Sequence, residues 1–290
     1  MPDLQGALQS LDGLSVGDAL GNVLTFADRA VLEKRELPTG PWSYTDDTEM
    51  AISIVELLRD RQTIDQNKLA TAFALRFNPR RGYGDGVRRL LQEIGMSPVG
   101  SWQTLSRQLF FGTGSYGNGG AMRVAPLGAF FHHDYAEVSR QAVLSAEVTH
   151  AHFEGVQGAV AVAVATACLR REREWDRDRF FSTVLEFVRP GKTKTGIEKA
   201  RDLANDVDGF EAGRLLGNGH EIAAYDTVPL CLWSVAVNPD CFESAIWRVL
   251  LAGGDQDTTA AITGGVIAGR TAPPREWVAL REALPEGLSA

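Results

Sequence analysis

Apolar residues recur every three to four positions along most of this chain, and this spacing limits the fold more than any other feature. Such a period places apolar side chains on one face of an α-helix, whereas β-strands show strict alternation. The sequence therefore predicts an all-α protein. The segments that follow the helical pattern are residues 4–20, 48–58, 69–77, 87–94, 136–148, 153–169, 180–188, 197–207, 222–237, 242–251 and 258–268.

Signals for strands and for domain boundaries are scarce. The Asn-Gly pairs at 118–119 and 218–219 lie between helical stretches rather than between alternating β-branched segments. No glycine- or proline-rich connection is long enough to be an interdomain linker, and we find no internal repeat. We predict that residues 1–290 form one compact domain of many medium-length helices.

The net charge, the apolar runs and the cysteines limit which ligands and which cellular location we expect for this protein. The net charge of −8 argues against general electrostatic binding of duplex nucleic acid, so nucleic acid is expected only as a modified substrate in a local pocket. The longest apolar run, 158–169, is too short to span a membrane, and no signal peptide is indicated. The chain has no metal-binding pattern among its cysteines, Cys168, Cys231 and Cys241. We expect them to be reduced core thiols of a cytoplasmic protein. We also expect the protein to be a monomer.

Two short acidic segments lie at opposite ends of the chain: Thr-Asp-Asp-Thr at 45–48 and Asp-Gln-Asp-Thr at 255–258. The first precedes a helical pattern, and Asp46 as N-cap with Glu49 at N3 would form a capping box. Only one of two adjacent carboxylates can cap a helix, however. Both are used if they bind a cation such as Mg²⁺ or Mn²⁺, which prefers oxygen ligands.

The second acidic segment follows a glycine pair at 253–254, which permits unusual backbone angles. Capping by Asp257 explains one carboxylate and leaves Asp255 without a role. The helical segment that follows is small and apolar, so we expect it to be buried, where acids without a counter-charge are costly. A cation removes that cost, and the two segments form a single metal site if the fold brings them together.

A glycine-rich segment occupies residues 112–123 and contains a GxGxxG pattern at 112–117. A dinucleotide-binding fold needs a preceding strand and a parallel sheet, for which the sequence gives no support. We therefore expect a loop whose amides approach a ligand, such as a phosphate. The Thr-His-Ala-His segment at 149–152 has two interpretations: an imidazole pair at the edge of a site, or polar residues at a helix junction.

Together, segments 13–21, 45–48, 117–126, 149–152 and 253–258 resemble the ADP-ribosylglycohydrolase family in type and in order. That family includes the dinitrogenase-reductase-activating glycohydrolases and the ADP-ribosyl-acceptor hydrolases. The resemblance implies an all-α orthogonal multi-helix bundle with a binuclear metal site holding two Mg²⁺ or Mn²⁺ ions. The implied metal ligands are Thr45, Asp46, Asp47, Asp255, Asp257 and Thr258.

The same resemblance implies a hydrolase that removes ADP-ribose from a modified arginine or serine side chain of a protein by water attack at the ribose C1″. The alternatives are hydrolysis of O-acetyl-ADP-ribose or ADP-ribosylated nucleic acid, and non-catalytic binding of ADP-ribose. Asp46, Asp47 and Asp255 are the candidate catalytic residues, because metal-site carboxylates can also accept the proton of water. The candidate substrate-binding residues are Gly114, Ser115, Tyr116, Gly117, Asn118, Gly119 and His150.

One position departs from the family pattern. Many members carry a Glu-Phe pair shortly after the first matching segment, and the pair here is Thr25-Phe26. Threonine cannot act as a general base, and Asp28 would need a shifted register to replace the glutamate. The departure therefore concerns the catalytic base or the acceptor specificity.

Overall fold

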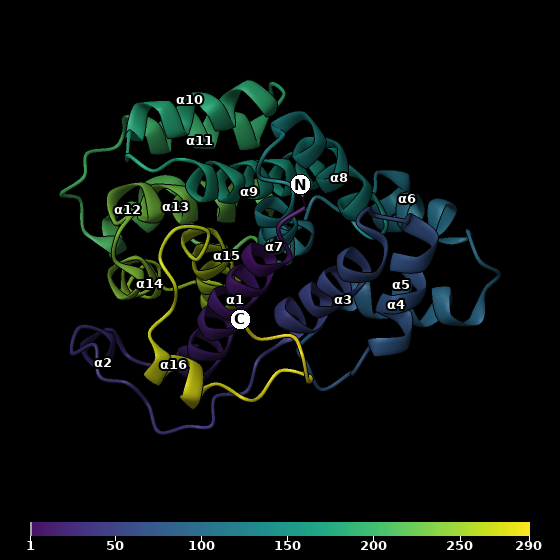
Figure 1. Cartoon of the computed structure of the whole chain (residues 1–290), viewed down its shortest axis with the longest axis horizontal. Coiled ribbons are helices and arrows are strands. Elements are labelled where there is room, and N and C mark those ends of the chain that lie inside the picture. The colour runs from purple at the N-terminus through teal and green to yellow at the C-terminus, as the bar shows by residue number, and fades with distance from the viewer. Residues whose placement is uncertain (1) are drawn as a thin grey trace.

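The structure is a computed structural model that describes residues 2–290, and it consists of helices joined by loops (Figure 1). Within these residues, extended pairing is limited to two isolated bridges, Trp42 with Arg281 and Gly117 with Ala223. The predicted all-α orthogonal bundle in a single compact domain is confirmed. The elements are α1 (Leu4–Leu24), α2 (Arg29–Leu32), α3 (Asp46–Arg61), α4 (Gln66–Arg76), α5 (Asp85–Met96), α6 (Trp102–Gly112), the 3₁₀ helix η1 (Asn118–Gly120), α7 (Ala125–Phe130), α8 (Tyr135–Glu147), α9 (Phe153–Arg171), α10 (Arg177–Phe187), α11 (Lys192–Asp202), α12 (Gly209–Leu216), α13 (Ala224–Val237), α14 (Phe242–Leu250), α15 (Gln256–Ile267) and α16 (Arg275–Leu280).

Helices α1 and α15 pack against each other at the centre of the domain (Figure 1). Gly13, Gly17 and Gly21 of α1 recur every four residues and therefore share one face. A Cβ atom at Gly13 would lie 2.3 Å from the carbonyl oxygen of Gly264, and one at Gly17 would lie 2.0 Å from that of Ala260. The two helices thus run antiparallel with their backbones in contact, and the second half of α1 lies against the first turn of α15.

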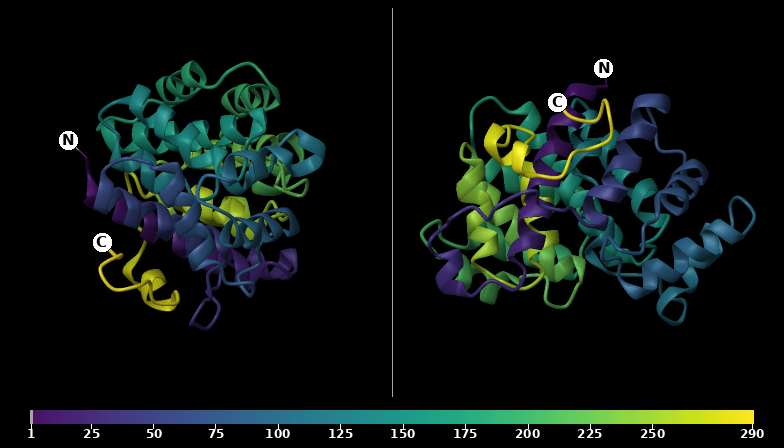
Figure 2. Two further views of the ribbon diagram at one scale, coloured as in Figure 1. Left: turned by 90° about the vertical axis from the view of Figure 1, so that its right-hand side faces the viewer. Right: turned by 90° about the horizontal axis from the view of Figure 1, so that it is seen from below.

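The remaining helices surround this pair. Helices α4, α5 and α6 extend outward beyond α3 on one side, while α12, α13 and α14 lie on the other side (Figures 1 and 2). The first turns of α3 and α15 are adjacent, because α3 packs against both α1 and α15. Segments separated by some two hundred residues in the sequence therefore meet near the middle of the molecule.

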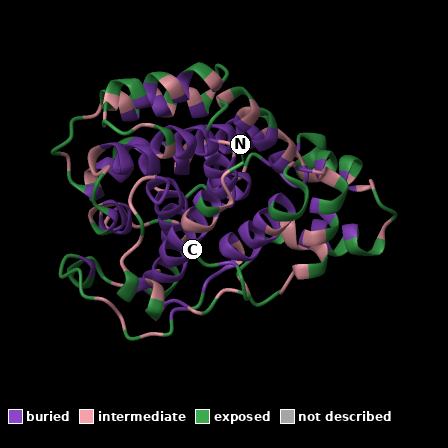
Figure 3. Cartoon of the chain, in the orientation of Figure 1, coloured by how far each residue is buried: buried purple, intermediate pink, exposed green. Residues whose placement is uncertain are grey.

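Helix α9 is longer and more buried than the predicted apolar run at 158–169. By length and composition alone, its 19 residues could cross a membrane. However, 83% of its most apolar 18-residue window is buried inside the protein, against α7, α8, α10 and α13 (Figure 3). Such burial is typical of the core helix of a soluble protein, and it explains why residues on every side of α9 are apolar.

The helix boundaries differ most from the prediction between residues 190 and 220. Helix α11 begins at Lys192 rather than at 197, because the carboxylate of Glu154 accepts hydrogen bonds from the N–H groups of Lys192 and Thr193, at 2.7 and 2.9 Å. This cap comes from α9 and leaves no signal in the local sequence. The short helices α2, α7, α12 and α16 are absent from the sequence prediction.

The prediction that all three cysteines pack in the core is wrong for Cys241. Cys168 and Cys231 are buried, whereas Cys241 is exposed just before α14. Its apolar neighbour Phe242 faces the core and is fully buried. Apolar neighbours in sequence thus indicate a buried helix face, but not that a residue at the helix terminus lies on it.

Candidate active site

The first turn of α3 is held by a buried aspartate of α1, Asp18. Its carboxylate accepts hydrogen bonds from the backbone N–H and hydroxyl of Thr45, at 3.0 and 2.8 Å. It also accepts hydrogen bonds from the backbone N–H and hydroxyl of Thr48, at 3.1 and 2.5 Å. Asp18 therefore fixes the segment that carries Asp46 and Asp47, although the sequence analysis assigned it no role.

The N-cap of α3 is Thr45, not Asp46 as the capping-box interpretation predicted. The Thr45 hydroxyl accepts a hydrogen bond from the N–H of Asp47 at 3.4 Å and lies 3.0 Å from the Asp47 carboxylate. Asp46 is the first helical residue, and its own N–H donates to the carbonyl of Arg81 at 2.8 Å. Because capping uses the threonine, both aspartates are left for another role.

The second acidic segment forms the start of α15. Asp255 occupies the N-cap position without a capping hydrogen bond, and Gly253 and Gly254 both adopt positive φ, at 67° and 75°. Asp257, predicted to cap the helix, lies instead in its first turn, where its carboxylate accepts from the N–H of Thr258 at 3.0 Å. The glycine pair therefore turns the chain so that neither aspartate is consumed as a cap.

Close packing of α1 on α15 brings the two acidic segments together. A Cβ atom at Gly21 would lie 2.7 Å from the Cα atom of Asp257, so Asp257 reaches the end of α1 that carries Asp18. The pKa values of the aspartates reflect the same proximity. Burial, and then the carboxylate of Asp18, raise the pKa values of Asp46 and Asp47 well above the usual range for aspartate.

Burial also raises the pKa of Asp18 to about 7, with a further upward effect from Asp257 that opposes the hydrogen bond from Thr48. Burial and the charge of Asp257 likewise raise the pKa of Asp255 to about 7. Acids crowded in this way disfavour their own ionisation unless a positive charge lies among them. Without a bound cation, this cluster of aspartates would therefore destabilise the fold.

The donor set fits a hard divalent cation. It consists of carboxylate and hydroxyl oxygens, and one of them, Oδ1 of Asp47, is buried without a hydrogen-bond partner. Among residues 2–290, no group of three or more His, Cys, Asp or Glu side chains already has the geometry to hold a metal ion. The metal site, including Thr258 as a ligand, stays a prediction supported by the donor chemistry.

The glycine-rich loop reaches the acidic cluster directly. The side-chain amide of Asn118 donates to the Asp255 carboxylate at 2.7 Å and to the Thr227 hydroxyl at 3.0 Å. Gly114 adopts positive φ, and a Cβ there would lie 2.7 Å from the backbone nitrogen of His152, so this end of the loop packs tightly on the start of α9. The loop is thereby fixed at both ends, with Tyr116 partly exposed between them.

A second loop, residues 217–223, joins the glycine-rich loop to α15 and was missed by the sequence analysis. The carbonyl of Ile222 accepts from the N–H of Asn118 at 3.1 Å, and the carbonyl of Asn218 accepts from that of Asp255 at 3.0 Å. Gly217 and Gly219 adopt positive φ, as does the β-branched Ile222. The Asn-Gly pair marked a turn here, but no sequence signal placed that turn beside Asp255.

The two histidines of the 149–152 segment have different environments. His150 is buried, its Nδ1 lies 2.8 Å from the Thr149 hydroxyl, and burial lowers its pKa to about 3, so it is neutral. A Cβ at Gly119 would lie 2.7 Å from His150 Nε2, so the imidazole packs beneath the glycine-rich loop. His152 caps α9 by accepting from the N–H of Glu154 at 3.1 Å, as the helix-junction interpretation requires.

Comparisons with known proteins define the family. A family model described as ADP-ribosylglycohydrolase matches residues 3–288. The chain belongs to the ADP-ribosylglycohydrolase family. It is 30% identical to ADP-ribosylhydrolase ARH3 of Homo sapiens, over 92% of this chain and 86% of the relative, and 30% identical to that of Gallus gallus, over 95% and 89%.

A more distant relative, ADP-ribosylarginine hydrolase Tri1 of Pseudomonas putida (strain GB-1), is 25% identical over 95% of this chain and 74% of the relative. A solved structure titled "ADP-ribosylglycohydrolase-related protein complex" has the same fold. Its TM-score is 0.72 at 23% identity, and the match covers 96% of this chain and 93% of that one.

Thr25, the departure from the family pattern, offers no acid to the site. Its hydroxyl donates to the carbonyl of Gly21 at 3.0 Å, within the end of α1, and Phe26 is almost fully exposed. Asp28 is exposed at the start of α2. Neither Thr25 nor Asp28 therefore contributes a carboxylate to the cluster of aspartates of α1, α3 and α15.

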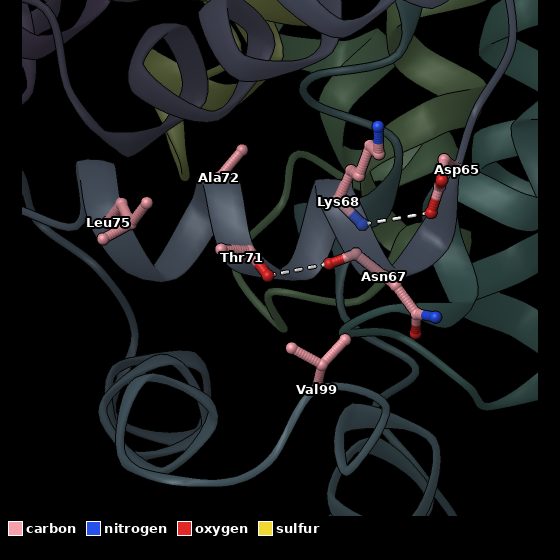
Figure 4. A pocket seen from close by; sticks show the side chains of 7 residues that line it. All are labelled: Asp65, Asn67, Lys68, Thr71, Ala72, Leu75 and Val99. Atoms are coloured by element: carbon pink, nitrogen blue, oxygen red, sulfur yellow. Dashed lines mark hydrogen bonds between the residues drawn. The ribbon is translucent and has the colours of Figure 1, made fainter.

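A surface hollow of about 500 Å³ lies away from the acidic cluster, on the outer side of α4 (Figure 4). Two of its polar side chains form hydrogen bonds with the backbone of α4. Asp65 accepts from the N–H of Lys68 at 3.1 Å, and the Thr71 hydroxyl donates to the carbonyl of Asn67 at 2.9 Å. It contains no cluster of acids or nucleophiles, so we do not assign the activity to it. The lining residues are Asp65, Asn67, Lys68, Thr71, Ala72, Leu75 and Val99.

Proposed function

We propose that this chain is a metal-dependent hydrolase that removes ADP-ribose from a modified protein side chain, with water attacking C1″ of the ribose. One observation carries the proposal: Asn118 of the glycine-rich loop donates at 2.7 Å to Asp255 of the acidic cluster. This contact joins a candidate diphosphate-binding loop to candidate metal ligands. The two sequence features thereby become parts of one site.

The residues that would hold two Mg²⁺ or Mn²⁺ ions are Thr45, Asp46, Asp47, Asp255, Asp257 and Thr258. Metal ions in such sites orient the substrate and lower the pKa of water, which supplies a nucleophile at neutral pH. The buried Oδ1 of Asp47, which lacks a hydrogen-bond partner, supports this assignment. So does the mutual crowding of the aspartates, since a cation offsets their repulsion.

The chain's own groups would bind and orient the rest of the substrate. The N–H groups of Ser115 and Tyr116 have no acceptor within residues 2–290, so they can donate to the diphosphate. The partly exposed rings of Tyr116 and Phe110, with centroids 6.0 Å apart, offer flat surfaces on which adenine can stack. His150 would act by supporting the loop from beneath.

Proton transfer would fall to an aspartate of the cluster, because the position of the family's glutamate is Thr25. Asp46, Asp47 and Asp255 are the candidates for accepting the proton of the attacking water. The transition state would carry oxocarbenium character, as in other glycoside cleavages. The name of ARH3 supports hydrolysis of an ADP-ribosyl bond, and that of Tri1 supports arginine as the modified side chain. Arginine and serine linkages are therefore the first to test.

The test measures ADP-ribose release from arginine- and serine-modified proteins with Mg²⁺, Mn²⁺ or EDTA. Wild type is compared with Asp255→Ala/Asp257→Ala and with Asp176→Asn, a control that removes an exposed aspartate capping α10. We expect metal-dependent release by wild type and the control, and none by the double variant.

Thermal unfolding in the same buffers separates binding from catalysis. At a metal concentration one hundred times Kd, the free energy of unfolding rises by about 2.7 kcal/mol. Wild type and Asp176→Asn should gain this stability, and the double variant should not. Metal-induced stabilisation and ADP-ribose binding without release from either substrate would redirect the proposal to other ADP-ribosyl compounds or to a binding role.

A further inference from the structure

Arg123 directly follows the glycine-rich loop, and its side chain has no exposed surface. Its guanidinium donates to the carbonyl of Ser145 on α8 at 2.9 Å and contacts the sulfur of Met50 on α3 at 3.5 Å. It also lies over the ring of Phe73 on α4, at 4.6 Å from the ring centroid. The charge is thus enclosed by three helices and contacts a carbonyl, a thioether and an aromatic face.

No carboxylate pairs with Arg123 among the described residues, and its Nε has no hydrogen-bond partner. Arg281, the other deeply buried arginine, instead pairs with Asp12 at 3.1 Å. Burial of an unpaired charge is costly unless a compensating charge lies nearby. Burial accordingly lowers the pKa of Arg123 to about 9, and the charges of Tyr83 and Asp46 oppose that effect.

An acid of the cluster, Asp46, interacts electrostatically with Arg123 from about one helical turn away. Met50, which the guanidinium touches, is four residues after Asp46 on α3, so the two residues share a helix face. One turn spans about 5.4 Å, which places the guanidinium within roughly 10 Å of the Asp46 carboxylate. No other arginine or lysine is enclosed on this side of the acidic cluster in the part of the chain that the structure describes.

We propose that Arg123 is the fixed internal counter-charge of the acidic cluster and sets its affinity for divalent cations. The inference rests on the metal site of the proposed function. Two divalent cations neutralise four of the five negative charges in the cluster, and Arg123 neutralises the remaining one. The acids in this balance are Asp18, Asp46, Asp47, Asp255 and Asp257.

Arg123 would have opposite effects on the two states of the site. Without metal, its positive charge attracts the carboxylates and stabilises the fold. With metal, the same charge repels the cations and limits their affinity. For charges at roughly this separation, Coulomb's law predicts that loss of the positive charge lowers the Kd for metal by about tenfold. A residue with only a packing role would leave the metal affinity unchanged.

The test compares Mg²⁺ and Mn²⁺ binding, measured by calorimetry and by the metal-induced rise in Tm, at pH 7.5, where the Arg123 guanidinium, with its pKa of about 9, carries its charge. The neutral variants are Arg123→Met and Arg123→Gln, and Arg123→Lys keeps the charge but loses the planar fork. Arg177→Met is the matched control, because Arg177 also donates to backbone carbonyls and lies over an aromatic ring, that of Phe181.

We expect both neutral variants to lower Tm in EDTA and to bind metal about tenfold more tightly than wild type. Arg123→Lys and Arg177→Met should bind metal within about twofold of wild type. If neither neutral variant folds but Arg123→Lys does, the requirement for charge is supported. Failure of all three variants at position 123 to fold would indicate a packing role and overturn the proposal.

Two further outcomes separate this inference from the proposed function. Equal metal affinity in wild type and the neutral variants overturns the role of Arg123 and leaves the metal site intact. No binding of Mg²⁺ or Mn²⁺ to wild type overturns the metal site, and the charge balance with it.

Discussion

Replacement of Gly17 by alanine tests whether backbone contact between α1 and α15 builds the site. In a solvated helix interior, alanine is more favourable than glycine by about 1 kcal/mol. At Gly17, however, the new Cβ would lie 2.0 Å from the carbonyl oxygen of Ala260 and 2.6 Å from its carbonyl carbon. Both are backbone atoms, so no side-chain rotation can relieve the clash.

The size of the effect follows from these distances. An ordinary contact needs a separation of about 3.5 Å, so the two helices must move apart by more than about 1 Å. The backbones are equally close at Gly13 and Gly21, where an added Cβ would lie 2.3 and 2.4 Å from carbonyl oxygens, and this prevents a local pivot. Overpacking of this kind costs about 1–3 kcal/mol, and for a chain of this length we expect Tm to fall by about 2–5 °C.

The matched control is Gly95→Ala in α5. Gly95 is exposed, and its added Cβ would make an ordinary 3.8 Å contact with the side chain of Ala74. We expect this variant to gain about 0.5–1 kcal/mol. Thermal unfolding of both variants with and without Mg²⁺ is the assay, because separation of α1 from α15 should also reduce the metal-induced stabilisation. A Gly17→Ala protein as stable as the control, with unchanged response to Mg²⁺, would refute the reasoning.

Two further predictions concern parts of the fold outside the acidic cluster. Burial raises the pKa of Glu154, but hydrogen bonds from Thr193 and Lys192 outweigh it, and the net pKa is lowered. The stability from this carboxylate is therefore present above its unfolded pKa and lost as pH falls through the folded value. Glu154→Gln should cost about 2 kcal/mol at pH 7 and progressively less below about pH 4.5 in urea titrations, whereas a pH-independent difference would contradict this assignment. For the thiols, burial raises the pKa of Cys168 to about 11 and that of Cys231 to about 12, while Cys241 is exposed. Alkylation followed by mass spectrometry should modify Cys241 in the native protein and the other two only after unfolding; rapid native labelling of Cys231 would contradict the packing of α13.

Much of the fold was predictable because each helix has its own apolar period. The segments at 4–20, 48–58 and 153–169 all lie within helices of the structure, since the burial of one face needs only local spacing. The start of α11 was not predictable in this way. Its first N–H groups are satisfied by Glu154, a residue of another helix, so the boundary depends on tertiary contact.

The candidate site also contains residues that the sequence could identify and residues that it could not. The acidic segments and the glycine-rich loop could be identified from residue type and spacing, because each acidic segment has more carboxylates than one helix cap can use and a glycine-rich backbone can bind an anion. Asp18 could not be distinguished in this way from any aspartate within an apolar helix. Its role appears only where four donors from Thr45 and Thr48 surround its carboxylate.

The sequence by itself thus determined that the chain is helical, that its family is that of the ADP-ribosylglycohydrolases, and which oxygen-rich segments are candidates for chemistry. Only the tertiary structure decided that Asp47 and Asp255 belong to one cluster, that Asn118 reaches it, and that an unpaired arginine lies behind it. The physical reason is distance along the chain. Helical periodicity acts over a few residues, whereas the site depends on glycine-mediated contact between helices at opposite ends of the sequence.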